Sequence, residues 1–362
     1  MQRGLRHEIY DTVVQYQIQR EFASAAIRKE ALAYLHPPFE ALMFAPLAHL
    51  SYVGAFITWD LINFGALLPV SFVLSEQVLK FKTCSWSTWL LVSLAFFPIF
   101  LTLLQGQDSI LLLLLYTLVF LCLKKKREKL AGAFLALGLF RPQLVLPFLL
   151  LWIARGGRKL LLGFLPIAAV LGLISLAVVG VHTALSYPSI VLHVDRSLTQ
   201  STVWPSDMPN LRGMLYGFTR HHPQSDWVTY LLSIVLLVLV AWLIRGNREE
   251  QDLFYWDFSL AILTSAAVSH YCFGHDLSTL LLPIALVISK LQLSNDVRPS
   301  ARVLMLCAVA LLFFSPLQLF LVGHYQLGVM GWDVLLLVAG ILLQIWPKPQ
   351  LRNSALAAST LV

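Results

Sequence analysis

The stretch "LAGAFLALGLFRPQLVLPFLLLWIA" (residues 130–154) is apolar except at its centre, where Arg141, Pro142 and Gln143 follow one another. About 20 apolar residues are enough for a helix to cross the hydrocarbon core of a bilayer. Pro142 disfavours the helical conformation at the residue before it. An arginine at that depth is costly unless it lines a protein interior or a wet cavity. The stretch therefore predicts a membrane segment that breaks at Arg141.

The whole chain has the composition of a membrane protein. Of its 362 residues, 58% are hydrophobic and 12% are charged, and its mean hydropathy is +0.75. Soluble domains average about 25% charged residues. The apolar residues form long blocks rather than amphipathic stripes, which predicts an all-α fold, a polytopic transmembrane helical bundle. We place the blocks at 53–73, 86–104, 109–123, 130–154, 160–180, 227–244, 253–271, 277–289, 301–322 and 334–346.

Charge and cysteine content exclude several classes of partner and site. The net charge of +7 does not indicate nucleic acid, because most basic residues lie in short loops between apolar blocks, as cytoplasmic loops do. Cys84, Cys122, Cys272 and Cys307 form no close pair, so neither a disulfide framework nor a zinc site is indicated. The sequence predicts the lipid bilayer as a partner and no cofactor or bound metal, and it leaves a divalent-metal requirement open.

Two basic loops, "KKKREK" (124–129) and "RGGRK" (155–159), flank the opening stretch on both sides. The positive-inside rule puts both loops in the cytoplasm. The stretch would then be a re-entrant hairpin whose arms of about 11 residues rise about 16 Å, to mid-membrane. A single kinked crossing is the alternative, and it would put most later basic loops outside. With the hairpin, the other blocks make about nine spans.

This topology divides the chain into three parts. Residues 1–50 would be an extracytoplasmic or interfacial helical segment, residues 51–346 the transmembrane core with an outer loop at 181–226, and residues 347–362 a cytoplasmic tail. Nothing in residues 1–50 would carry an N-terminus across the membrane. We therefore expect a first transmembrane helix to precede this sequence in a longer chain.

The outward turns hold most of the polar groups expected at membrane level, and such groups usually line a cavity or a substrate path. The candidate substrate-binding residues are His36, Glu40, Gln105, Gln107, Arg141, Gln143, Asn210, Arg212, His270, Tyr271 and His275, and the candidate catalytic residues are Asp108 and Asp276. Each cluster also has a purely structural alternative. The glycine between the two glutamines would make a turn, Arg141 would snorkel or pair with Asp108, and Asp276 would cap a helix.

These residue types suit transfer chemistry on a phosphate. A guanidinium such as that of Arg141 makes bidentate bonds to phosphate oxygens. A carboxylate, Asp108 or Asp276, could act as general base on an acceptor hydroxyl. The sequence has no phosphate-binding glycine loop and no serine nucleophile elbow, which argues against a nucleotide motor and a serine hydrolase.

The order of motifs resembles glycosyltransferase family 87 of the GT-C superfamily, which includes mannosyl- and arabinofuranosyltransferases. The motifs are "HPPFEALMFAPL" (36–47), "LLQGQDSILLLLL" (103–115), "LAGAFLALGLFRPQLVLPFLLL" (130–151), "MPNLRGML" (208–215) and "CFGHDLSTLLLP" (272–283). The resemblance covers roughly residues 8 to 290. It implies a polyprenyl-phosphate sugar donor of mannose type, hexose or pentose. Transfer would go to a glycan or glycolipid hydroxyl, at an active site on the outer face of the cell membrane.

One feature departs from the family pattern. Family members carry an acidic residue, taken as the catalytic base, on the outer side just after their first transmembrane helix. "EIYD" (8–11) matches only the part of that loop downstream of the acid. Either the chain is truncated, or Asp11, Asp108 or Asp276 has taken over. A transporter or lipid-linked-sugar flippase and an inactive remnant are the competing hypotheses, because broken helices at mid-membrane also mark transporter sites.

Overall fold

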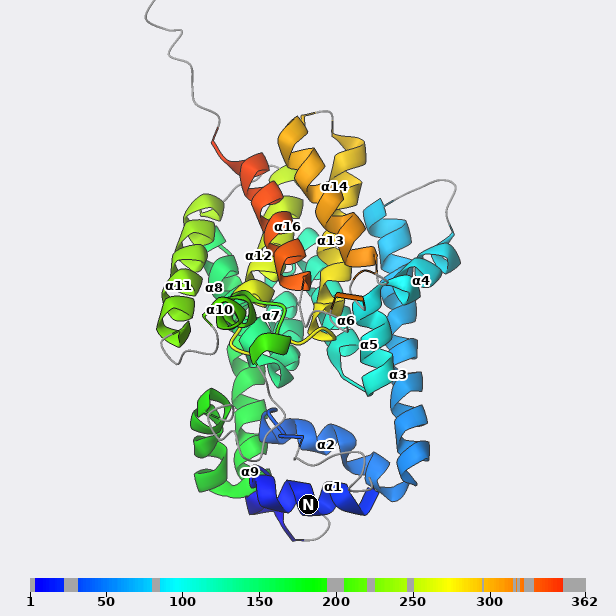
Figure 1. The fold of residues 1–362 in the computed structure, drawn as a ribbon, viewed down its shortest axis with the longest axis vertical. Helices are drawn as coiled ribbons and strands as arrows, with labels where there is room; N and C mark the ends of the chain where they lie inside the picture. Colours follow the sequence, from blue (N-terminus) through cyan, green and yellow to red (C-terminus); the bar gives the residue numbers. More distant parts are fainter. Residues whose placement is uncertain are drawn as a thin grey trace, which may run out of the picture.

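The computed structural model describes residues 4–22, 32–79, 85–193, 205–219, 225–245, 251–294, 296–314, 317, 320–321 and 329–347. Within these residues every regular element is a helix (Figure 1). The predicted all-α membrane fold is confirmed. The predicted tail lies outside the described residues from position 348 onward.

The helices long and apolar enough to cross a membrane are fewer than the expected crossings. Among the described residues there are four, Tyr52–Val78, Arg158–His193, Asp226–Ile244 and Asp276–Leu293, and a bent pair makes a possible fifth. The other expected crossings are apolar helices of 10–17 residues, which is shorter than the hydrocarbon core requires. The number of nine spans therefore stays a prediction.

Short helices at the N-terminal end lie across one end of the bundle, between the lower ends of α3 and α9 (Figure 1). They are η1 (Arg6–Glu8), α1 (Thr12–Phe22), η2 (Pro38–Glu40), α2 (Ala41–Phe44) and η3 (Ala45–His49). Ser51 then caps α3 (Tyr52–Val73), since its hydroxyl accepts a hydrogen bond from the Gly54 amide. A π-helical turn, η4 (Leu74–Leu79), continues α3.

The next helices break at a bend and at a glycine turn. α4 (Trp86–Ala95) and α5 (Phe97–Gln105) meet at an angle of 73°. α5 ends at Gly106, whose φ of 60° is left-handed and suits glycine. Asp108 then precedes α6 (Ser109–Lys124). The structural alternative for the Gly-Gln stretch, a turn between helices, is therefore correct, and the turn presents both glutamines and Asp108.

The opening stretch of the sequence forms a hairpin. α7 (Glu128–Leu137) and η5 (Gly138–Phe140) lead to Arg141, and α8 (Pro142–Arg155) follows. Arg141 lies beside Asp108, at the start of α6. Both ends of the stretch lie near the opposite end of α6. The start of α7 packs closely against the start of α9, the helix that follows α8, since a Cβ on Gly163 would lie 1.7 Å from the Lys129 carbonyl oxygen. The chain therefore reverses at Arg141, as the flanking charges predict.

α9 (Leu161–His193) is two helical stretches that meet at a bend. Gly180 has φ 80° and ψ 164°, a backbone conformation essentially confined to glycine. The outer loop predicted at 181–226 stays a prediction, and its first part is helical as far as His193. The predicted loop also contains η8 (Pro205–Asp207) and α10 (Leu211–Phe218).

The remaining helices complete the core: α11 (Ser225–Ile244), α12 (Gln251–Val268), η9 (Asp276–Leu280), α13 (Leu281–Leu293), α14 (Pro299–Phe313) and α16 (Met330–Ile345). An aromatic cluster ties α6 and α8 to α12. Phe148 stacks on Trp152 with ring centroids 5.8 Å apart, and Phe258 meets both edge-on. This packing fixes α8, and with it the position of Arg141 at its N-terminus.

Candidate active site

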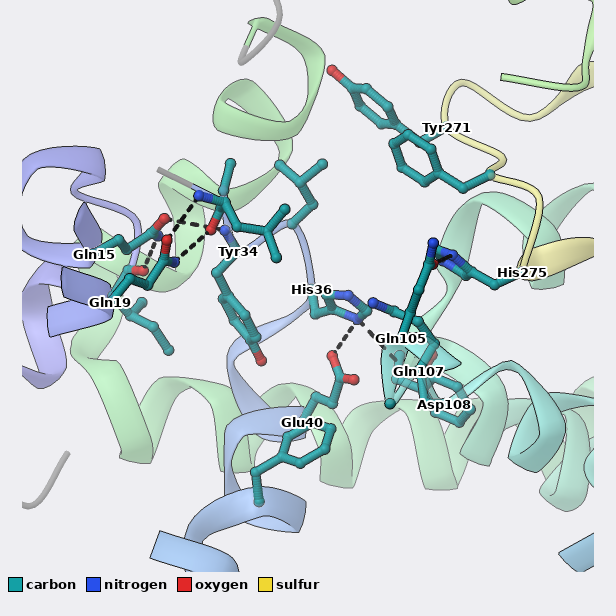
Figure 2. Close-up of a pocket in the computed structure, with 18 of the residues that line it drawn as sticks. Gln15, Gln19, Tyr34, His36, Glu40, Gln105, Gln107, Asp108, Tyr271 and His275 are labelled. Atoms are coloured by element: carbon teal, nitrogen blue, oxygen red, sulfur yellow. Dashed lines mark hydrogen bonds and ion pairs between the residues drawn. The ribbon is translucent and has the colours of Figure 1, made fainter. Parts of the chain in front are cut away.

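A cavity of about 1180 Å³ lies between the N-terminal segment and the ends of the core helices. Its walls come from α1 and residues 32–40 on one side and from the α5–α6 turn, the Arg141 turn and residues 271–275 on the other (Figure 2). Nine of the predicted site residues line it together: His36, Glu40, Gln105, Gln107, Asp108, Arg141, Gln143, Tyr271 and His275. The sequence-based expectation of one shared polar surface thus corresponds to one cavity.

Arg141 is the centre of the polar network, although only 4% of it is exposed. Its Nε donates to Asp108 Oδ1 at 2.9 Å, and its Nη2 reaches the same oxygen at 2.5 Å. Nη2 also donates to Gln107 Oε1 at 3.0 Å. The alternative of a pairing with Asp108 is therefore what the structure shows, and the snorkelling alternative is not.

Asp276 holds the other side of the guanidinium. Arg141 Nη1 lies 3.3 Å from Asp276 Oδ1, which also accepts a hydrogen bond from the Ser109 hydroxyl. Asp276 Oδ2 accepts from the Phe273 amide at 2.8 Å. Asp276 thus accepts from an amide that precedes it, whereas an N-cap residue would accept from an amide in the following turn. Both of its carboxylate oxygens have partners.

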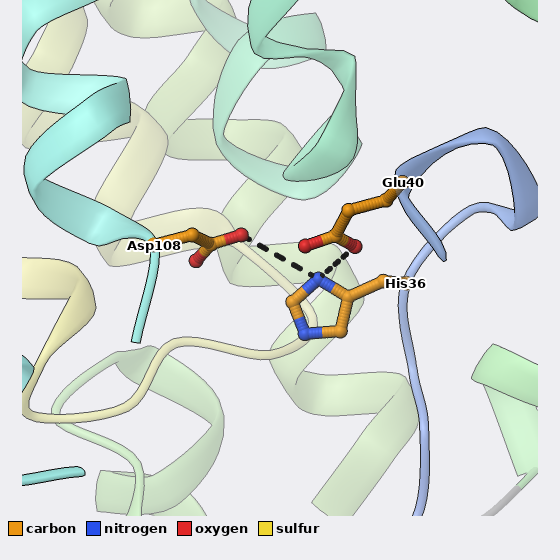
Figure 3. Close-up of side chains that lie close together, drawn as sticks. All are labelled: His36, Glu40 and Asp108. Carbon is orange, nitrogen blue, oxygen red and sulfur yellow. Dashed lines mark ion pairs between the residues drawn. The ribbon is translucent and has the colours of Figure 1, made fainter. Parts of the chain in front are cut away.

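His36 and Glu40 face this network from the N-terminal segment. Pro37 is extended and Pro38 opens η2, so His36 and Glu40 come to lie one turn apart. His36 Nδ1 is 2.5 Å from Glu40 Oε2 and 3.8 Å from Asp108 Oδ2. Figure 3 shows the imidazole with Nδ1 turned toward both carboxylates. Asp108 therefore bonds Arg141 through one oxygen and faces His36 with the other.

Burial and neighbouring charges shift the ionisation of these groups. Burial, with the Arg141 charge beside it, lowers the pKa of His36 to about 4. Burial and the negative charge of Asp108 raise the pKa of Glu40 well above its usual range. Burial also disfavours ionised Asp108, but the Arg141 guanidinium outweighs it and holds the pKa of that carboxyl below its usual range. Asp108 is therefore a charged carboxylate and a weakened base.

His275 and the two glutamines complete the wall. His275 Nδ1 and Gln105 Oε1 are 2.8 Å apart, so the ring N–H donates to the amide oxygen. The Asn63 amide donates to the Gln107 backbone oxygen at 2.9 Å and so fixes the turn from the side of α3. The cavity wall is thus held by bonds between α3, the α5–α6 turn and the residues before η9.

Four predicted site residues lie outside the cavity lining: Asp276, which pairs with Arg141, and Asn210, Arg212 and His270. Asn210 caps α10 by accepting from the Gly213 amide, and it donates to the Ser269 carbonyl oxygen. Arg212 pairs with Asp226 at 3.3 Å and lies over the Tyr271 ring. His270 Nδ1 lies 3.4 Å from the Tyr230 hydroxyl. These contacts give Asn210 and Arg212 a structural part in positioning Tyr271 and its neighbours.

The prediction from sequence missed the residues that hold the cavity's far wall. Gln15 and Gln19 of α1 bond the backbone of Tyr34 and Leu32, as Figure 2 shows. The centroids of the Tyr34 and His36 rings are 5.4 Å apart. Gln15 and Gln19 are one helical turn apart, so the sequence could have predicted that they share one face of a helix. Nothing in the sequence indicated which backbone groups they would bond.

The model of glycosyltransferase family 87 matches residues 34–269, well over half of the chain. The chain belongs to glycosyltransferase family 87. No curated protein matches the chain, and no solved structure matches it.

Family membership makes the protein a membrane glycosyltransferase. The matched region begins two residues before His36 and includes Glu40, Asp108 and Arg141, so most of the polar network belongs to the family domain. Tyr271, His275 and Asp276 follow the end of the match and reach the same network through space.

Proposed function

We propose that this family 87 protein transfers a mannose-type hexose or pentose from a polyprenyl-phosphate donor to a hydroxyl of a glycan or glycolipid. The acceptor lies on the extracytoplasmic side of the cell membrane. The observation that carries the proposal is the buried Arg141 guanidinium, held by Asp108 and Asp276 at the wall of a large cavity.

The placement of Arg141 suits the phosphate of such a donor. Its charge is permanent, and its planar donors match two phosphate oxygens at once. As the bond between sugar and phosphate breaks, negative charge develops on the leaving phosphate. A fixed cation in a site with little water stabilises that charge more strongly than water does. The carboxylates that bond Arg141 hold it in place before the donor arrives.

The acceptor hydroxyl must lose its proton during transfer. Of the two predicted carboxylates, Asp276 has both oxygens engaged by Arg141, Ser109 and Phe273. Asp108 bonds Arg141 through Oδ1 alone, and its buried Oδ2 faces His36 and Glu40. We therefore assign the base to Asp108 and assign Asp276 the positioning of Arg141.

The location of the cavity supports an outer-face site. The cavity lies at the end of α6 where Asp108 stands, whereas "KKKREK" follows the opposite end of that helix. Basic loops favour the cytoplasmic side. Exposed apolar residues on α3 and α9, such as Phe56, Leu61 and Leu173, offer lipid-facing surface beside the cavity for a polyprenyl chain.

The test is sugar transfer by the full chain in proteoliposomes that contain polyprenyl-phosphate [¹⁴C]mannose and a membrane glycolipid extract. We expect labelled glycolipid from the wild type and none from Arg141→Gln or Asp108→Asn. Arg155→Gln is the matched control, because it removes another guanidinium paired with a buried carboxylate, Asp257, away from the cavity. Normal transfer by Arg141→Gln and Asp108→Asn would overturn the site. Sugar flux without any glycosidic product would favour a transporter.

A further inference from the structure

We propose that His36, Glu40 and Asp108 bind a divalent cation of the Mn²⁺ and Zn²⁺ class. The sequence predicted no metal at these residues, because they come from two separate segments and show no ligand spacing. One ligand atom from each of the three side chains lies within 4.8 Å of the others. Figure 3 shows the three side chains turned toward a common space.

The polar atoms at this point lack other bonds. His36 Nδ1, Glu40 Oε2 and Asp108 Oδ2 are all buried, and apart from a proton that the Glu40 and Asp108 carboxyl groups can share, none has a hydrogen-bond partner among the described residues. They are nevertheless close, at 2.5 Å for Nδ1 to Glu40 and 3.8 Å for Nδ1 to Asp108. Buried polar atoms are rarely left unsatisfied. A cation among them would satisfy all three at once.

The donor set selects the kind of ion. One imidazole and two carboxylates suit Mn²⁺ or Zn²⁺, whereas a site for Mg²⁺ or Ca²⁺ would consist of oxygen ligands. Metal ligands need partners that orient them. Arg141 fixes Asp108 and is itself held by Gln107 Oε1, and the Tyr10 hydroxyl donates to the His36 carbonyl oxygen at 2.7 Å.

A divalent cation would offset the negative charge of the site; this step rests on the proposed function. Asp108 and Asp276 both pair with one guanidinium, that of Arg141, so this cluster is negative overall even while Glu40 is neutral. A lipid phosphate is also negative and would be repelled by it. A divalent cation between Glu40 and Asp108 neutralises the excess and lets the cavity accept an anionic donor.

Binding requires one local change. Two ligands of the same ion, each about 2.0–2.2 Å from it, are roughly 3 Å apart, so Glu40 Oε2 must withdraw from His36 Nδ1. Glu40 is at the end of η2, where its side chain can rotate without moving a long helix. The Arg141 charge nearby lowers the affinity, so titrations must extend to millimolar Mn²⁺.

The experiment is a Mn²⁺ titration of the purified full chain in detergent after EDTA treatment, with free Mn²⁺ measured by electron paramagnetic resonance. We expect one bound Mn²⁺ per chain, displaced by Zn²⁺. His36→Gln, Glu40→Gln and Asp108→Asn should each weaken binding at least tenfold. Glu76→Gln, which removes an exposed carboxylate in η4, is the matched control and should bind as the wild type does.

Size-exclusion profiles and melting temperatures establish that each variant is folded, and Mn²⁺ should raise the melting temperature of the wild type but not of Glu40→Gln. A wild type that binds neither Mn²⁺ nor Zn²⁺ would overturn the proposal, as would equal binding by folded Glu40→Gln. The titration contains no sugar donor, so it tests metal binding independently of transfer. A chain that binds Mn²⁺ but transfers no sugar in the proteoliposome assay would refute the proposed function alone. Asp108 Oδ2 cannot bind the cation and accept a proton at the same time. Loss of Mn²⁺ affinity in Asp108→Asn would therefore make Asp108 a metal ligand in place of the base, whereas unchanged affinity would leave it as the base alone and would overturn its part in the metal site.

Discussion

At the scale of single residues, Arg141 explains why the sequence breaks an apolar stretch with a charge. The guanidinium is buried but bonded to Gln107 and Asp108 of the α5–α6 turn and to Asp276 at the start of η9. Replacing a buried ion pair with apolar residues is often harmless, whereas removing one partner leaves an uncompensated charge. Arg141 therefore holds the cavity wall together as well as serving the proposed phosphate site.

Removing this charge should destabilise the protein. Arg141→Gln leaves two buried carboxylates without their cation, and such losses cost about 3–5 kcal/mol. Arg141→Lys keeps a cation without the planar fork, and should lose less stability and retain part of the transfer activity. Thermal unfolding in detergent measures the first effect. Equal melting temperatures for the wild type and Arg141→Gln would contradict this account of the network.

The sequence predicted which residues of this network meet but not how each one bonds. Asp108 and Arg141 could be paired in advance because charge rules placed both on the outer side. The capping of α10 by Asn210 was not foreseen, because asparagine before a helix reads equally well as a cap or as a ligand-binding group. His36 and Glu40 were foreseen as cavity residues, but their meeting with Asp108 depends on how the N-terminal segment folds back.

At the scale of elements, the bend in α9 attaches the N-terminal segment to the bundle. At the bend at Gly180, the Val179 carbonyl oxygen lies 2.7 Å from His7 Nδ1. The Thr183 hydroxyl donates to the His7 carbonyl oxygen at 3.0 Å. The sequence did not reveal this bend, because the apolar block was placed at 160–180 and the segment after it was expected to be a loop.

Gly180→Ala should loosen this attachment. Alanine at φ 80° is strained, and its Cβ would lie 3.1 Å from the His7 ring. Such backbone strain costs of order 1–3 kcal/mol. We expect a lower melting temperature and faster proteolysis of the first 40 residues. Gly172→Ala is the control, because it is helical with nothing within 4 Å of the added Cβ. Equal proteolysis of both variants would show that the bend does not hold the segment.

At the scale of the whole molecule, the proposed function requires a hairpin at Arg141 and a cavity that opens to the extracytoplasmic side. The reversal at Arg141 was predictable because the basic loops on its two sides carry the same topological signal. The lengths of the crossings were not, since several apolar blocks became helices of 10–17 residues. Packing against neighbouring helices, rather than block length, sets where each helix ends.

Cysteine labelling tests this topology. In a chain with the native cysteines replaced by alanine, Lys125→Cys and Arg158→Cys should react with a membrane-impermeant maleimide only from the cytoplasmic side. Glu8→Cys should react only from the opposite side. All three positions are exposed. Labelling of Lys125→Cys and Arg158→Cys from opposite sides would replace the hairpin with a single kinked crossing.

The most direct measurement of the central claim is an experimental structure of the full chain with a polyprenyl-phosphate sugar bound. The account predicts the phosphate in the cavity, with its oxygens about 2.7–2.9 Å from the Arg141 guanidinium nitrogens, and the polyprenyl chain leaving along the exposed apolar residues of α3 or α9. A donor bound elsewhere, with the Arg141 network intact and the cavity free of phosphate, would contradict it.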